Sequence, residues 1–87
     1  MGGYVCTILV FYVPMNRKAI PAHRRRLGDA IRNRRLSLKL SQEALAERID
    51  CHRNYIGNVE RGEQNITVDM LVRFAKALGC KPGELLR

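Results

Sequence analysis

Between residues 41 and 62 the sequence SQEALAERIDCHRNYIGNVERG carries two short helical patterns, separated by three residues from Asp50 to His52. Their apolar residues recur at helical spacing and are Leu45, Ala46, Ile49, Ile56 and Val59. The first of them begins after Ser41, whose hydroxyl can cap a free backbone N–H. Helices this short are not stable alone in water, so each must pack against other elements of the chain. The pair therefore predicts a small helical domain in which one face of each helix is buried.

Three further helices are expected around this pair. The first covers about residues 23–38, and its inward residues are Leu27, Ala30, Ile31 and Leu38. Another begins after the N-cap Thr67 and ends at Gly79, and its apolar residues are Leu71, Val72, Phe74, Ala75 and Leu78. The last begins at Pro82, because proline is favoured at the first helical position. The predicted fold class is all-α, with five helices in one domain over residues 23–87.

The chain is basic, with a formal net charge of +8, and the excess is confined to one part of it. Residues 1–40 hold nine Lys or Arg against the single acid Asp29, whereas residues 41–87 hold seven of each sign. Such an excess is suited to nucleic-acid phosphates, from which it would release counterions. A solvated basic face or a patch for an anionic membrane surface are the alternatives.

Neither a metal nor a catalytic site is predicted. The cysteines Cys6, Cys51 and Cys80 are odd in number and lack the spacing of metal ligands or of a disulfide framework. We expect Cys51 and Cys80 to be buried thiols in a reducing cytoplasm. The chain has two histidines and neither a recognisable nucleophile set nor a glycine-rich phosphate loop, so we expect a protein that is not an enzyme and needs no cofactor.

Residues 1–22 read as an extension and a linker. Within them, residues 4–13, YVCTILVFYV, favour a β-strand but have no second strand-like segment to pair with. The run is too short to span a bilayer and lacks the flanks of a secretory signal. Three interpretations stay open: an arm that pairs with its twin in a second subunit, a disordered extension, or a non-native extension if translation begins at Met15. The arm is favoured, and it is also a candidate surface for a protein partner.

A helix, a three-residue turn and a second helix with polar outward residues form the device that places one helix in the DNA major groove. The stretch from about residue 27 to 86 also resembles the Cro/C1-type (XRE) helix-turn-helix family. The matching elements are LSQEALA at 40–46, YI at 55–56, ERG at 60–62, and residues 71–78 followed by Gly79. ERG followed by NIT is, in addition, similar to the controller proteins of restriction–modification systems.

The resemblance implies roles for individual residues, with helix 53–60 in the major groove. Base edges would be reached by Arg53, Asn54 and Asn58, and the DNA backbone or groove edge by Gln42, Arg61 and Asn65. Arg35 and Glu60 match the family's structural ion pair. The chemistry agrees, since arginine pairs with guanine and asparagine with adenine in a bidentate fashion. Tyr55 is open between packing and a phosphate hydrogen bond.

Three positions depart from the family pattern. Asp50 and Lys39 stand where the family often has glycine, so a non-glycine residue must adopt a strained conformation in the turn at Asp50. His52 replaces a small hydroxyl residue. It is open between a weak cap, a phosphate contact that would strengthen binding at lower pH, and an exposed turn histidine, which is favoured.

Taken together, these features predict a sequence-specific DNA-binding transcriptional regulator, a repressor or autoregulator. It would bind a two-fold-symmetric operator on double-stranded DNA as a homodimer. The implied location is the bacterial cytoplasm, for a protein of bacterial, phage or plasmid origin. When it is bound to DNA it would lie at the nucleoid, and no membrane location is expected. The alternative is a protein-interaction module, such as an antitoxin or antiactivator, on the same fold.

Overall fold

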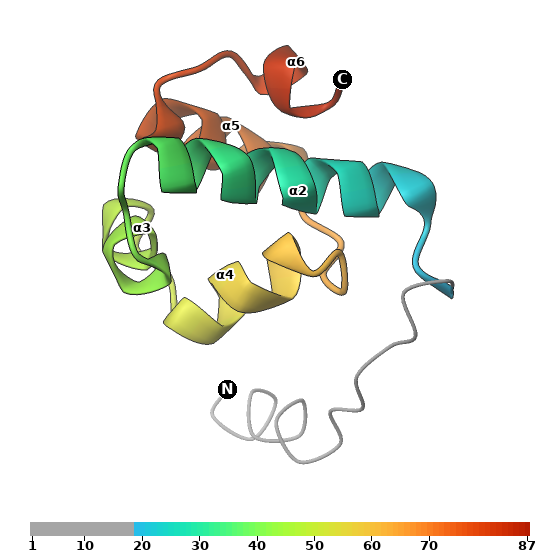
Figure 1. The fold of residues 1–87 in the computed structure, drawn as a ribbon, viewed down its shortest axis with the longest axis horizontal. Helices are drawn as coiled ribbons and strands as arrows, with labels where there is room; N and C mark the ends of the chain where they lie inside the picture. The colour runs from blue at the N-terminus through green and yellow to red at the C-terminus, as the bar shows by residue number, and fades with distance from the viewer. Residues whose placement is uncertain (1–18) are drawn as a thin grey trace.

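The computed structural model describes residues 19–87, so the run 4–13 and Cys6 lie outside the described residues. The described part contains helices and no strands, which confirms the all-α fold class. The elements, drawn in Figure 1, are α2 (Ala22–Ser37), α3 (Gln42–Arg48), α4 (Arg53–Glu60), α5 (Val68–Leu78) and α6 (Pro82–Leu85). None of these helices is long and apolar enough to cross a membrane.

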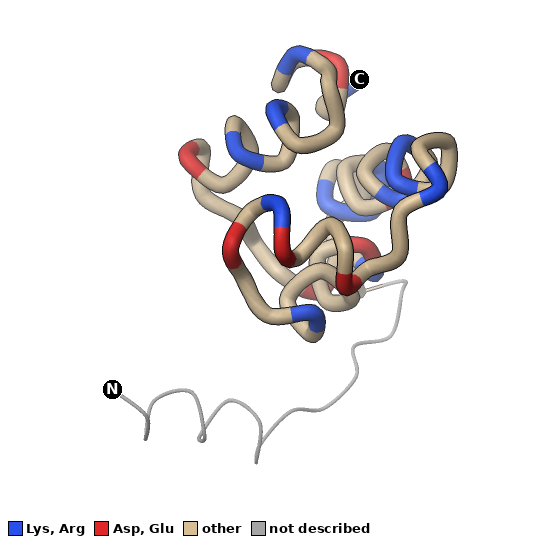
Figure 2. The backbone as a smooth tube through the Cα atoms, turned by 90° about the vertical axis from the view of Figure 1, so that its left-hand side faces the viewer, with Lys and Arg blue, Asp and Glu red and all other residues tan. Residues whose placement is uncertain are grey.

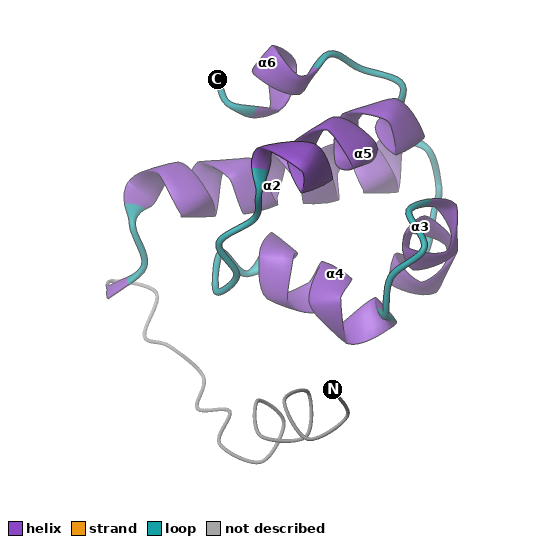
Figure 3. Ribbon diagram, turned by 180° about the vertical axis from the view of Figure 1, so that it is seen from behind, coloured by secondary structure: helices purple, strands orange, loops and turns teal. Residues whose placement is uncertain are grey.

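The long helix α2 lies beside α5, with α3 and α4 below this pair and α6 above it (Figures 1 and 3). It packs directly on α4, α5 and α6. Each of the five helices supplies one completely buried side chain to the common core: Ile31, Leu45, Ile56, Phe74 and Leu85. The two short helices are therefore stabilised by packing on the rest of the chain, as their length requires.

The predicted helix ends are present in the structure. The Ser41 hydroxyl accepts a hydrogen bond from the Ala44 N–H at 3.0 Å, and the Thr67 hydroxyl accepts one from Met70 at 3.1 Å. At the other end of α5, Gly79 adopts a left-handed conformation with φ of 71°. Each cap satisfies a backbone group that the helix itself leaves without a partner.

Several predictions about the core need correction. Helix α2 ends at Ser37, and Leu38 is 47% exposed instead of facing inward. Leu38 is the C-cap residue, and Lys39 after it takes a left-handed φ of 58°. The helix therefore ends where Leu38 lies, and its side chain stays at the helix end, outside the core. Val72 is only half-buried. Conversely, Ile20, which lay in the predicted linker, is almost fully buried, so the ordered packing begins before α2.

A close approach between α2 and α4 occurs at Gly28, a residue for which no role is predicted from the sequence. A Cβ atom at this position would lie 2.5 Å from the carbonyl oxygens of both Val59 and Glu60. Real Cβ atoms do not come this close to backbone oxygens, so a side chain here would force the helices apart. The absence of a side chain at Gly28 therefore sets how near α4 lies to α2.

Candidate nucleic-acid interface

Helix α4 has one buried and one polar side, and it has the bounds that the sequence predicts. Ile56 and Val59 face the core, whereas Arg53 and Asn54 are exposed and Asn58 is half-buried. The Nε atom of Arg53 lies 3.9 Å from a carboxylate oxygen of Glu43 on α3, but both side chains are more than half exposed. An ion pair this exposed contributes little, so Arg53 can exchange it for a base or a phosphate.

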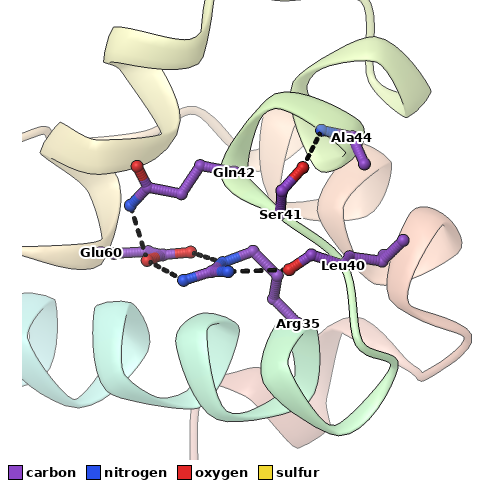
Figure 4. Close-up of polar contacts among 6 residues, drawn as sticks. All are labelled: Arg35, Leu40, Ser41, Gln42, Ala44 and Glu60. Carbon is purple, nitrogen blue, oxygen red and sulfur yellow. Dashed lines mark hydrogen bonds and ion pairs between the residues drawn. The ribbon is translucent and has the colours of Figure 1, made fainter.

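A buried ion pair fixes the end of α4 against α2 (Figure 4). Arg35 Nε and Nη2 donate to the two carboxylate oxygens of Glu60 at 2.6 and 3.0 Å. Arg35 Nη1 also donates to the carbonyl oxygen of Leu40 at 2.8 Å. The two side chains are only 9% and 4% exposed. A bidentate pair with its remaining donor satisfied is the geometry in which a buried ion pair holds two elements in register.

Gln42 at the start of α3 completes this network. Its amide nitrogen donates to Glu60 Oε1 at 3.1 Å, so one carboxylate joins α2, α3 and α4 (Figure 4). The sequence predicts that Gln42 contacts phosphate, but it does not predict that the same amide group bonds to Glu60. The amide oxygen of Gln42 cannot bond a phosphate oxygen, because both atoms are acceptors. A phosphate contact by Gln42 must therefore use the second hydrogen of its NH2 group. The phosphate contact stays a prediction.

The turn between α3 and α4 has the strain that the departures from the family pattern suggest. Asp50 adopts a left-handed φ of 56°. His52 caps α4, because its Nδ1 atom accepts a hydrogen bond from the Asn54 N–H at 3.0 Å. The ring is exposed as well, so two of the three interpretations hold together. A phosphate contact by a protonated ring stays a prediction, and it would require loss of the cap, because an imidazolium has no acceptor.

Tyr55 packs beneath the polar side of α4. Its ring stacks on that of Phe74 from α5, with centroids 6.4 Å apart and an angle of 19° between the planes. Burial raises the pKa of its phenol; the neighbouring Cys51 raises that pKa further, and Arg73 opposes the shift.

Burial also raises the pKa of the Cys51 thiol. Cys51 and Cys80 are half-buried, and not enclosed as predicted.

At the C-terminal end of α4, Arg61 connects three residues. Its Nη2 atom donates to Asn58 Oδ1, and its Nε atom donates to Glu63 Oε1 at 3.0 Å. Gly57 lies on the same helix as Asn58 and is buried beneath this cluster. A Cβ atom at Gly57 would lie 3.2 Å from the Arg61 guanidinium and 3.8 Å from the Gln42 amide oxygen. The polar side of α4 is thus partly covered by its own neighbours. Asn65 in the following loop is exposed.

The basic residues are grouped along α2, which Figure 2 shows nearly end-on with several blue segments. One of them, Arg34, pairs with Glu84 of α6 at 3.5 Å. Within residues 19–87, no group of three or more His, Cys, Asp or Glu side chains is placed to hold a metal ion. The arrangement offers amide and guanidinium groups on one helix, with positive charge on the helix that braces it, and these are the groups that contact bases and phosphates.

Comparison with known proteins identifies the arrangement. The profile of the helix-turn-helix family matches residues 31–85, which include the whole of α3 and α4. The chain belongs to this family. It is 45% identical over 60 residues to the control protein C.BamHI of Bacillus amyloliquefaciens, covering 68% of this chain and 74% of the relative. It is 47% identical over 60 residues to the control protein C.SmaI of Serratia marcescens, covering 69% and 71%.

The solved structures agree with the sequence relatives. The restriction-modification controller protein C.AhdI from Aeromonas hydrophila superposes with a TM-score of 0.72 at 37% identity. The match covers 75% of this chain and 98% of C.AhdI. Membership of the Cro/C1-type helix-turn-helix family, and with it the role of a DNA-binding regulator, is therefore established for this chain.

Proposed function

We propose that this DNA-binding regulator is the control protein of a restriction–modification system, and that it binds a two-fold-symmetric operator as a homodimer. The observation that carries the proposal is the 45% identity to a control protein over a stretch that includes the whole helix-turn-helix. A repressor or autoregulator is the mode of action we expect. Such a protein needs a rigid recognition helix, and α4 is braced by the bidentate Arg35–Glu60 pair.

In the proposed complex, α4 lies in the major groove and presents Arg53 and Asn54, both exposed, to base edges. The phosphate contacts are proposed for the N-terminal end of α3 with Gln42, and for the residues around the groove edge, which are His52, Tyr55, Arg61 and Asn65. The basic surface of α2 adds long-range attraction for the duplex.

The proposed homodimer is supported by apolar side chains that the single chain leaves exposed. Val68 is 75% exposed and Leu86 is 56% exposed. A second copy of the chain would cover such residues. The strand arm at residues 4–13 stays a second proposal for association, and it is tested by comparing the size in solution of the full chain with that of a chain starting at Met15. An unchanged association state would rule out the arm.

The decisive experiment is selection of bound sequences from random DNA with the purified full-length protein. The expected result is a palindromic consensus whose half-sites lie about one helical turn apart. Arg53→Ala should lower affinity for that site by about 1–3 kcal/mol and relax the preference at one base pair of each half-site.

Arg26→Ala is the matched control, because it removes the same charge from an exposed position on α2. It should weaken binding to all DNA sequences about equally and reduce the salt dependence of that binding. If Arg53→Ala also weakened all sequences equally, direct readout by Arg53 would be refuted.

A further inference from the structure

The orientation of the Asn58 side-chain amide is determined by its partner. Arg61 Nη2 donates to the Asn58 Oδ1 atom. A guanidinium has donors only, so the amide atom facing it must be the oxygen, and the two ends of the amide cannot be interchanged. The Asn58 oxygen is therefore directed to Arg61, and its NH2 group is the other branch of the side chain.

Arg61 is itself held in place, although its side chain is 53% exposed. Its Nε atom donates to Glu63 at 3.0 Å, and the Glu63 side chain is only 7% exposed. Its Nη1 atom lies over Gly57, where a Cβ would be 3.2 Å away. The bond to Glu63 thus fixes the guanidinium beside Asn58, and the absence of a side chain at Gly57 leaves room for it, so the amide orientation is built into the free protein.

Asn54 provides a contrast on the same helix. Its side chain is exposed, and none of the hydrogen bonds between described residues uses its amide group. Its oxygen and nitrogen can therefore both pair with adenine, which offers one acceptor, N7, and one donor, N6, in the major groove. Asn58 differs because a positive charge stands at its oxygen. That charge repels the amino group of adenine and attracts acceptor atoms.

On the basis of the proposed function, we infer that Asn58 contacts guanine and not adenine. Guanine presents two acceptors in the major groove, N7 and O6, which match the two hydrogens of the Asn58 NH2 group beside the Arg61 charge. Arg61 is then a positioning residue for this contact, and Glu63 holds Arg61. The usual pairing of asparagine with adenine is replaced because of the residue that follows α4.

Sequence selection from random DNA tests the inference with the wild type, Asn58→Asp and Arg61→Leu. The aspartate in Asn58→Asp has the same shape as asparagine and can still accept the hydrogen bond from Arg61, so folding is preserved. Its second carboxylate oxygen replaces the NH2 group, and it accepts hydrogen bonds where the NH2 group donates them. At one base pair of each half-site the wild type should require guanine. At the same base pair Asn58→Asp should prefer cytosine, which offers the N4 donor. Arg61→Leu should shift the same base pair toward adenine.

A second measurement uses only the wild-type protein and its selected site. Replacing guanine by 7-deazaguanine, one base at a time, removes the N7 acceptor. Two sensitive guanines are expected in each half-site, one for Arg53 and one for Asn58, each with a loss of affinity of about tenfold. The guanine assigned to Asn58 should become insensitive in Asn58→Asp.

The inference is overturned if the base pair that Asn58→Asp changes carries adenine in the wild-type consensus. It is also overturned if Arg61→Leu leaves the preference at that base pair as it was, or if Asn58→Asp changes no base pair. These results would leave the proposed function intact. Failure of the wild type to select any sequence would refute the proposed function instead.

Discussion

Replacing Gly28 by alanine tests whether the approach of α2 to α4 holds the recognition helix in place. The new Cβ would lie 2.5 Å from two backbone oxygens, and ordinary contact begins at 3.4 Å. The helices must therefore separate by about 1 Å locally. Overpacking of this kind costs about 1–3 kcal/mol, and alanine recovers up to about 1 kcal/mol through its better helix propensity.

The expected net loss is up to about 2 kcal/mol in the free energy of unfolding. In a domain of this size it corresponds to a decrease of up to roughly 16 °C in the melting temperature, measured by circular dichroism at 222 nm. One of the two oxygens belongs to Glu60, so DNA affinity should also fall, even at temperatures where Gly28→Ala is fully folded.

Gly83→Ala is the matched control, because a Cβ at Gly83 meets nothing within 4 Å. Its melting temperature should equal or exceed that of the wild type, since alanine restricts the unfolded chain more than glycine does. A Gly28→Ala protein that melts as high as Gly83→Ala would show that α4 is not seated against the Gly28 backbone, and the reasoning would fail.

Three further outcomes are expected. Glu60→Gln leaves Arg35 buried without its counter-charge, so urea denaturation should show a loss of about 3 kcal/mol; a loss below about 1 kcal/mol would contradict the role of the pair. Asp50→Gly relieves a left-handed residue and should raise stability by up to about 1 kcal/mol, whereas Glu47→Gly in α3 should lower it by a similar amount. Because the pKa of Tyr55 is raised in the folded state, its stabilising contribution is complete below about pH 10 and is lost as the pH rises further; the melting temperature of the wild type should therefore fall more steeply there than that of Tyr55→Phe.

The sequence predicted those parts of the fold that depend on local chemistry. The caps Ser41 and Thr67 and the stop at Gly79 were recognisable because hydroxyl groups and glycine act on backbone within a few residues. Leu38 was misplaced because it lies at the helix end, and nothing in the spacing of apolar residues shows where a regular helix gives way to a turn.

The candidate site was less predictable, because its geometry depends on contacts between helices. Gly28 is a single glycine inside a helical pattern, and its partner oxygens lie more than thirty residues away. The bond from Gln42 to Glu60 likewise joins residues of two different helices that no sequence period relates. A glycine that interrupts a helical stripe was the one available signal for the close approach at Gly28.

Side chains of α2 and α3 both bond to the Glu60 carboxylate. This arrangement affects how DNA-binding preferences can diverge among related proteins. The residues that hold α4 in place, Arg35, Gln42 and Glu60, are not the residues that α4 exposes for base contacts. Arg53 and Asn54 can be exchanged without altering the helix that carries them, so new operator preferences are accessible by single substitutions at little risk to folding. Asn58 is the exception, because a change there must also suit Arg61. Divergence at that position is expected either to keep an acceptor for Arg61 or to change both residues together.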